Sequence, residues 1–128
     1  MFLLDINFLL DVVTGRSVNS DRYNKSLMAL IESDNACISV SSIPTIEYII
    51  KKNYKTSVEK LSGLLTVLRK VKTPSYVDLT SPLAKYDIED YLVELSARSI
   101  SATVITGDKD FINKSDIAVH PDKLLEEG

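Results

Sequence analysis

The sequence has few of the residues that build disulfides, zinc sites or membrane spans. It contains one cysteine (Cys37), one histidine (His120) and no tryptophan. A single cysteine excludes an intrachain disulfide, and one residue of each kind does not make a His–Cys zinc cluster. Cys37 lies in an apolar stretch, where packing in the core is its expected role. No apolar run approaches the roughly 18 residues of a membrane-spanning helix.

The net charge and the N-terminal residues further limit the kinds of protein that this sequence can encode. The net charge is −3, from 18 acids and 15 bases, so the chain lacks the broad basic surface that coats nucleic acid non-specifically. The tyrosines are scattered and predict no base-stacking platform. Because the N-terminus lacks a basic region and a small-residue cleavage site, we expect a cytoplasmic protein with no membrane association. A nuclease whose acids gather in one pocket stays compatible with this composition.

Apolar patterns predict strands alternating with helices in a single domain, residues 1–128. Strands are expected at 2–4, 36–40, 76–79, 102–106 and 117–119, and helices at 8–13, 21–32, 44–52, 58–68 and 87–99, with a short terminal helix from Pro121. The basic cluster at 69–72 is typical of a helix C-terminus. The alternation predicts a three-layer α/β/α sandwich with a central parallel sheet.

Four acids occupy strand ends or helix starts. Asp5 and Asp108 follow predicted strands, while Glu47 and Asp90 lie early in predicted helices. The carboxyl ends of parallel strands and the starts of the following helices share one edge of the sheet. Asp90 joins that edge if the first turn of its helix approaches it. Taken alone, Asp5 is equally well explained as a helix cap. Together, the positions predict Asp5, Asp90 and Asp108 in one pocket, with Glu47 nearby.

Such a set of carboxylates favours metal-dependent phosphodiester chemistry. Mg²⁺ and Mn²⁺ prefer oxygen ligands, and a bound ion relieves the repulsion between neighbouring carboxylates. Paired ions of this kind activate water and stabilise the leaving oxygen of a phosphodiester. An aspartate-nucleophile phosphatase is the alternative enzyme class, since an apolar strand ending on Asp5 also occurs there. That pattern requires a second acid two residues later, where this chain has Asn7.

Four motifs, in order along the whole chain, resemble those of PIN domains, the fold of many VapC-like toxin ribonucleases from bacterial toxin–antitoxin pairs. The opening motif is FLLDINFLLD (2–11), followed by IPTIE (43–47), DYLVELSA (90–97) and VITGDKDF (104–111). The stretch VHPDKLL (119–125) also resembles the tail of that family.

The resemblance implies a single PIN-like domain that cleaves RNA with Mg²⁺ or Mn²⁺. The implied metal ligands are Asp5, Glu47, Asp90 and Asp108. Asn7 and Thr106 would orient those carboxylates. Asp110 either assists the metal or belongs to an ordinary turn. The resemblance further implies a homodimer and, as protein partner, an antitoxin segment wrapped around it.

The sequence departs from the family pattern at several positions near these motifs. Ile6 stands where the family usually has Ser or Thr, Gly107 replaces a commonly larger residue, and the stretch before Asp90 is short. Asp87 lies three residues before Asp90, so the two can share a helix face and compete for the same role. These departures keep open a second hypothesis, a degenerate PIN domain that binds protein or RNA without cleaving it.

Overall fold

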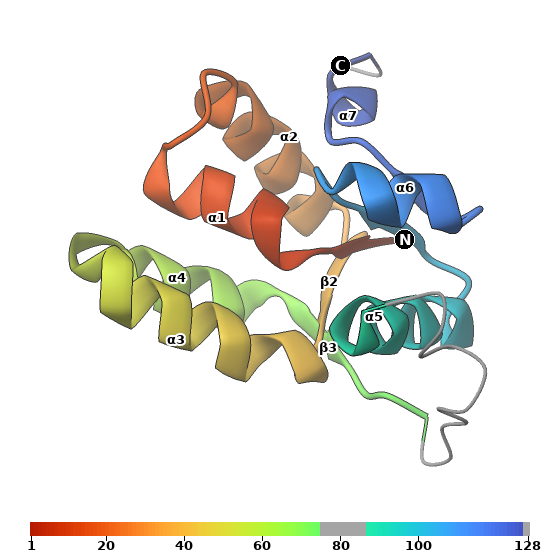
Figure 1. The fold of residues 1–128 in the computed structure, drawn as a ribbon. Coiled ribbons are helices and arrows are strands. Elements are labelled where there is room, and N and C mark those ends of the chain that lie inside the picture. The colour runs from red at the N-terminus through yellow and green to blue at the C-terminus, as the bar shows by residue number, and fades with distance from the viewer. Residues whose placement is uncertain (75–86, 127–128) are drawn as a thin grey trace.

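The computed structural model describes residues 1–74 and 87–126 (Figure 1). The elements are β1 (Phe2–Leu4), α1 (Ile6–Thr14), α2 (Ser20–Glu32), β2 (Ala36–Ser39), η1 (Val40–Ser42), α3 (Ile43–Asn53), η2 (Lys55–Ser57), α4 (Val58–Val67), β3 (Arg69–Val71), α5 (Ile88–Ser99), β4 (Thr103–Ile105), α6 (Lys109–Lys114), β5 (Ala118–Val119) and α7 (Asp122–Glu126). In the described part of the chain, no helix is both long enough and apolar enough to cross a membrane.

The five strands form one parallel sheet in the order β3-β2-β1-β4-β5. β1 lies at the centre, where Phe2 is paired with Ala36 on one side and Thr103 on the other. The strand order reverses at β1, and ligands of open α/β sheets bind at such switch points, beyond the carboxyl ends of the strands. The predicted α/β sandwich with a central parallel sheet is confirmed.

Each face of the sheet supports its own apolar core because successive strand residues point to opposite faces. Leu4 belongs to the larger core, under α1, α2, α3, α4 and α7, which includes Phe8, Leu9, Leu27, Ile46 and Ile50. Leu3 belongs to the smaller core beneath α5 and α6, with Cys37, Val93, Ala97, Val104 and Phe111. Cys37 is fully buried, so its expected core position is confirmed.

Two elements differ from the sequence prediction. Residues Arg69–Val71, interpreted as a helix end, form the strand β3 beside β2. Basic side chains are common on sheet edges because they discourage pairing with other chains, and Arg69 and Lys70 are exposed there. The prediction also missed α6, which begins directly after Asp108. The strand expected at 76–79 lies outside the described residues.

Two glycines are expected to respond oppositely to substitution by alanine. Gly15 ends α1 with a φ of +69°, a left-handed conformation that disfavours a side chain. Gly63 lies inside α4, where an added Cβ would meet no atom within 4 Å. Gly15→Ala should therefore lower the free energy of unfolding by about 1 kcal/mol, and Gly63→Ala should raise it by about 0.5–1 kcal/mol. Urea denaturation of both variants measures the difference, and effects of the same sign would contradict these assignments.

Candidate active site

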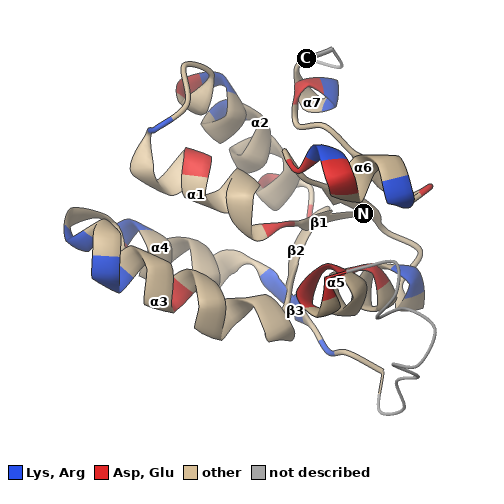
Figure 2. Ribbon diagram, in the orientation of Figure 1, with Lys and Arg blue, Asp and Glu red and all other residues tan. Residues whose placement is uncertain are grey.

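A pocket of about 400 Å³ opens where β1 and β4 end and α1, α5 and α6 begin. Its lining residues come from both halves of the chain: Asp5, Ile6, Asn7, Thr45, Ile49, Asp87, Glu89, Asp90, Asp108, Asp110, Phe111 and Lys114. Figure 2 shows acidic segments gathered at the starts of α1, α5 and α6, while many of the basic segments lie on or beside α3, α4 and β3. Asp5, Asp90 and Asp108 thus line one pocket, although their chemical role stays a prediction.

Asp5 is a buried acid at the end of the central strand, with 6% of its surface exposed. It precedes α1, but its side chain makes no capping hydrogen bond to that helix. Instead, Asp5 Oδ2 accepts a hydrogen bond of 2.8 Å from the Thr106 hydroxyl at the end of β4. Burial raises the pKa of Asp5, and the Thr106 hydrogen bond opposes that rise. The structure therefore does not support the helix-cap alternative for this carboxylate.

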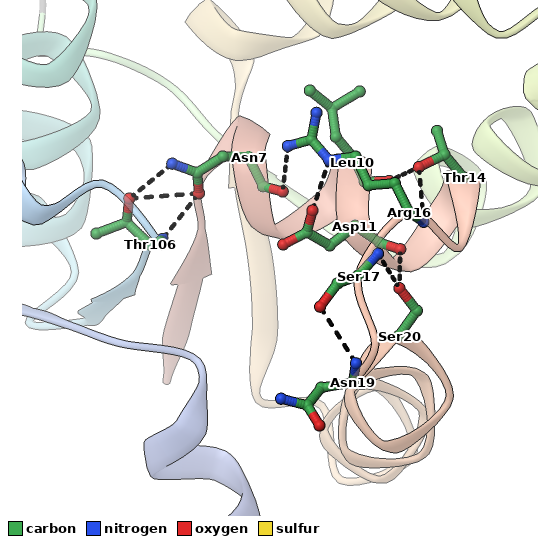
Figure 3. Close-up of polar contacts among 10 residues, drawn as sticks. Asn7, Leu10, Asp11, Thr14, Arg16, Ser17, Asn19, Ser20 and Thr106 are labelled. Carbon is green, nitrogen blue, oxygen red and sulfur yellow. Dashed lines mark hydrogen bonds and ion pairs between the residues drawn. The ribbon is translucent and has the colours of Figure 1, made fainter.

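Thr106 and Asn7 hold the ends of β1 and β4 together (Figure 3). Because the Thr106 hydroxyl donates to Asp5, it is left to accept from Asp108 N at 3.1 Å and from Asn7 Nδ2 at 3.3 Å. Asn7 Oδ1 in turn accepts from Gly107 N at 2.9 Å. Thr106 therefore contacts Asp5 directly, whereas Asn7 fixes the turn that carries Thr106.

The first turn of α5 brings three acids to the pocket. Asp87 caps this helix, since its Oδ1 accepts from Glu89 N at 2.9 Å and from Asp90 N at 3.4 Å. Asp90 is half-buried, and burial together with the charges of Asp5 and Asp108 raises its pKa to about 7. The structure thus gives Asp87 a capping role and places the Asp90 carboxyl in the field of the other acids.

Asp108 caps the N-terminus of α6, as Asp87 caps that of α5. Its Oδ1 accepts from Asp110 N at 2.9 Å and from Phe111 N at 3.4 Å, so this carboxylate caps the helix at the rim of the pocket. Asp110 is exposed on the first turn of α6 and also lines the pocket. Gly107 leaves room for a side chain, since an added Cβ would lie 3.8 Å from Asn7 Oδ1, an ordinary contact distance.

Glu47 lies away from this pocket, contrary to expectation. Its Oε1 is 3.2 Å from Lys51 Nζ, and 54% of its side chain is exposed. It lines a separate groove between α3 and α4, together with Leu61 and Leu65. Glu47, which was expected near the pocket, is therefore not among its lining residues, and a role for Glu47 as a metal ligand stays a prediction.

The sequence analysis missed Glu89, which lines the pocket beside Asp90. Burial raises the pKa of Glu89, and the Thr45 hydroxyl opposes that rise. Acids in the first turn of a helix are common because they interact favourably with the helix dipole, so nothing in the local pattern distinguishes Glu89 from an ordinary first-turn acid. Glu89 can be recognised as a pocket residue only in the folded structure, where Thr45 of α3 meets α5.

The donor chemistry of the pocket fits a hard divalent cation. Its acidic lining offers carboxylate oxygens, and Glu89 Oε1 is buried without a hydrogen-bond partner in the described structure. Among residues 1–74 and 87–126, however, no three His, Cys, Asp or Glu side chains converge closely enough to hold one ion. Metal binding would require these carboxylates to turn further toward one another.

Comparison with known proteins relates this chain to others by structure. No family model matches the sequence, and a search of curated proteins finds no match. The solved structure of VapBC2 from Rickettsia felis, bound to a DNA fragment from its promoter, superposes with a TM-score of 0.74 at 20% identity, covering 93% of this chain and 97% of that one. PAE2754 from Pyrobaculum aerophilum superposes with a TM-score of 0.66 at 17% identity, covering 98% and 87%.

Both similarities extend over nearly the whole of each chain, and at these identities they bear on the fold alone. In this chain, β1 lies at the centre with β2 and β3 on one side and β4 and β5 on the other, and helices cover both faces. The resemblance to PIN domains is therefore confirmed at the level of the fold: this chain has a PIN-like α/β structure.

Proposed function

We propose that this protein is a metal-dependent endoribonuclease that hydrolyses phosphodiester bonds of single-stranded RNA. The observation that supports it best is the pocket at the carboxyl edge of the sheet, where Asp5, Asp90 and Asp108 come together from distant parts of the chain. The PIN-like fold is typical of nucleases, which supports the same reaction class.

Asp5, Asp90 and Asp108 would hold Mg²⁺ or Mn²⁺ in this pocket. When bound, the ion would lower the pKa of a coordinated water and offset the negative charge of the phosphodiester. Thr106 fixes the orientation of the Asp5 carboxylate, and Asn7 fixes the turn that carries Thr106. Asp110 lies at the rim, where it can accept hydrogen bonds from water near the substrate.

The proposed reaction needs no histidine base. An oxygen of water attacks the backbone phosphorus and its proton passes to solvent. The bond from phosphorus to the 3′ oxygen breaks, and that oxygen takes a proton from solvent. The products are a 5′-phosphate and a 3′-hydroxyl, which balances the hydrolysis. The described carboxylates position the reactants, and His120 lies outside the pocket lining, next to Asp122.

Chelation of metal tests this proposal directly. Cleavage of a labelled single-stranded RNA should disappear in EDTA and return with excess Mn²⁺ or Mg²⁺, and the new 5′ ends should carry phosphate. A DNA strand of the same sequence serves as the specificity control. Cleavage that persists in EDTA would contradict the metal-dependent mechanism, and absence of cleavage under all metal conditions would favour the non-catalytic alternative.

That alternative, a binding module derived from a nuclease, rests on two observations. Glu47 is absent from the pocket lining and is paired with Lys51, and the apolar Ile6 lines the pocket. An aspartate-dependent phosphatase is less consistent with the structure, because the amide of Asn7 is engaged with Thr106 and Gly107 where a second acid would be required.

Partners follow from the same proposal. The Rickettsia structure contains VapBC2 with DNA, and we propose an antitoxin-like protein partner for this chain, alongside the RNA substrate and a second copy of the chain. The resemblance to PIN domains implies the dimer, and the apolar residues at helical spacing in 58–68 are one surface that could support it. In the structure, Leu61, Leu64 and Leu68 are buried in the protomer's own core, so the stripe itself supplies less free surface than the sequence indicated.

A further inference from the structure

One face of α3 leads from the acidic pocket to the exposed surface of the protein. Thr45 and Ile49 on this helix line the pocket. Tyr48 and Lys52 are exposed and continue the same face, because residues three or four apart lie side by side on a helix. By the rise of an α-helix, Lys52 lies about 10 Å along the axis from Thr45, which is the length of about three stacked nucleotides. A strand that occupies the pocket therefore reaches Tyr48 and Lys52 within a few nucleotides.

Tyr48 carries an aromatic ring that the core does not use. Of its surface, 63% is exposed. Tyr23 is buried, and Tyr54 and Tyr91 are partly buried, so Tyr48 is the exposed one among the tyrosines that the structure describes. Because so little of Tyr48 is buried, packing contributes little to the stability that an aromatic residue can supply. Such an exposed ring can stack on one unpaired base.

Lys52 places a positive charge beside this ring. Its Nζ is 3.3 Å from the Tyr48 hydroxyl oxygen and 5.5 Å from the centre of the ring, so the ammonium lies near the hydroxyl edge and leaves the ring centre uncovered. The neighbouring Lys51 is paired with Glu47, but no acid among the described residues forms an ion pair with Lys52. A flat ring and a free cation thus lie together, which suits a ligand that joins an aromatic base to an anion.

The charge of this part of the chain favours a polyanion. Residues 43–72 hold seven bases and two acids, a net charge of +5, whereas the rest of the chain holds 8 bases and 16 acids, a net charge of −8. The seven bases are all exposed, and Figure 2 shows basic segments on or beside α3, α4 and β3. The acidic pocket repels phosphates when it holds no cation, so the neighbouring basic surface is where an RNA strand is attracted.

We propose that Tyr48 and Lys52 form a nucleotide subsite beside the acidic pocket, where the Tyr48 ring stacks on an unpaired base and Lys52 binds a backbone phosphate of the same RNA strand. This subsite rests on the function proposed above and adds how the substrate is held outside the reacting group. Charge alone would also attract an acidic protein segment, but such a segment offers no base to the exposed ring. RNA matches both the ring and the cation.

RNA binding to matched variants tests the subsite. The whole protein is titrated in EDTA, where the proposed reaction does not consume the RNA, and the fluorescence anisotropy of a labelled single strand gives the Kd. Tyr48→Ala should weaken binding about 5- to 150-fold, the effect of losing one stacked base. Tyr48→Phe keeps the ring and should bind within about twofold of the unaltered protein. An abasic strand of the same length keeps the phosphates, so its affinity should not depend on Tyr48.

Lys52→Gln tests the phosphate contact separately. It should weaken the binding of both strands and reduce the slope of log K against log salt concentration by about 0.7, because one contact to a single strand is lost. Lys25→Gln removes an exposed base on α2 and is the matched control, with no expected change in slope. Both side chains are exposed, and thermal melting checks that each variant is folded.

The outcomes separate the subsite from the proposed reaction. Unchanged RNA affinity in Tyr48→Ala, an equal loss for the RNA and the abasic strand, or failure of the unaltered protein to bind RNA would overturn the subsite. Displacement of the RNA by poly-glutamate as effectively as by unlabelled RNA would assign the surface to an acidic protein partner and also overturn it. Absence of cleavage with Mn²⁺ in a protein whose RNA binding depends on Tyr48 would overturn the hydrolase and retain the subsite.

Discussion

Asp5→Asn is expected to abolish metal binding and RNA cleavage together, with a loss of activity of about 10³-fold or more. The substitution is nearly isosteric, and an amide oxygen can still accept the Thr106 hydrogen bond that measures 2.8 Å to the carboxylate. What disappears is the charge that would hold the cation. Cleavage assays and Mn²⁺ titration on the same sample measure both losses.

The thermal stability of Asp5→Asn is a second measurement, and it is expected to rise while the activity falls. Burial raises the pKa of Asp5, which means that the ionised form is disfavoured in the folded, metal-free protein. Removing that charge should therefore raise the melting temperature at neutral pH in EDTA. Asp21→Asn, which removes an exposed acid on α2 outside the pocket, is the control. A variant that loses activity because it unfolds, or one that cleaves at the unaltered rate, would contradict the assigned role.

The second large effect concerns pH and Asp90. In the unfolded chain this carboxyl titrates near 3.8, whereas the folded pocket raises its pKa to about 7. The folded state therefore holds the proton more tightly, and the stability that this proton contributes is fully present below pH 3.8 and is lost as the pH rises to about 7. The metal-free protein should lose about 1–2 kcal/mol across this window, since solvent screens a half-buried carboxylate.

Asp90→Asn removes this dependence and should melt at a higher temperature than the unaltered protein at pH 8 in EDTA, but with little difference at pH 4.5. Mn²⁺ should reverse the order at pH 8, because the ionised Asp90 then has a cation to bind and the amide does not. Melting curves at both pH values, with and without Mn²⁺, measure the effect. If the control Asp21→Asn raised the melting temperature at pH 8 as much as Asp90→Asn does, the effect would not originate in the pocket.

The sequence was sufficient for the fold because its buried strands are short apolar runs with clear ends. Phe2–Leu4 and Thr103–Ile105 are recognisable in this way, and the acids that follow them lie where parallel strands end. β3 was missed because its pattern is that of an exposed edge, with two basic residues and one apolar residue. Such a segment derives its strand conformation from pairing with β2, which no local pattern reveals.

The candidate site was harder to predict at the level of side-chain direction. Placing Glu47 early in a helix after β2 was sound, but the rotation of α3 about its axis is set by the burial of Ile46 and Ile50. A difference of two residues on a helix separates a pocket-facing side chain from one in solvent. Glu89 was missed for the converse reason, since its place in the pocket lining depends on how α5 packs against Thr45.

The hydrogen bond between Thr106 and Asp5 joins residues 101 positions apart in the sequence. During synthesis, Asp5 leaves the ribosome long before its partner has been made, and at about 5–20 residues per second the interval lasts at least several seconds. Throughout that time the nascent chain has β1 but neither Thr106 nor the Asp108 that follows it. Until Thr106 has been synthesised, the nascent chain therefore cannot assemble the acidic pocket, so the pocket is among the last features of the fold that can form.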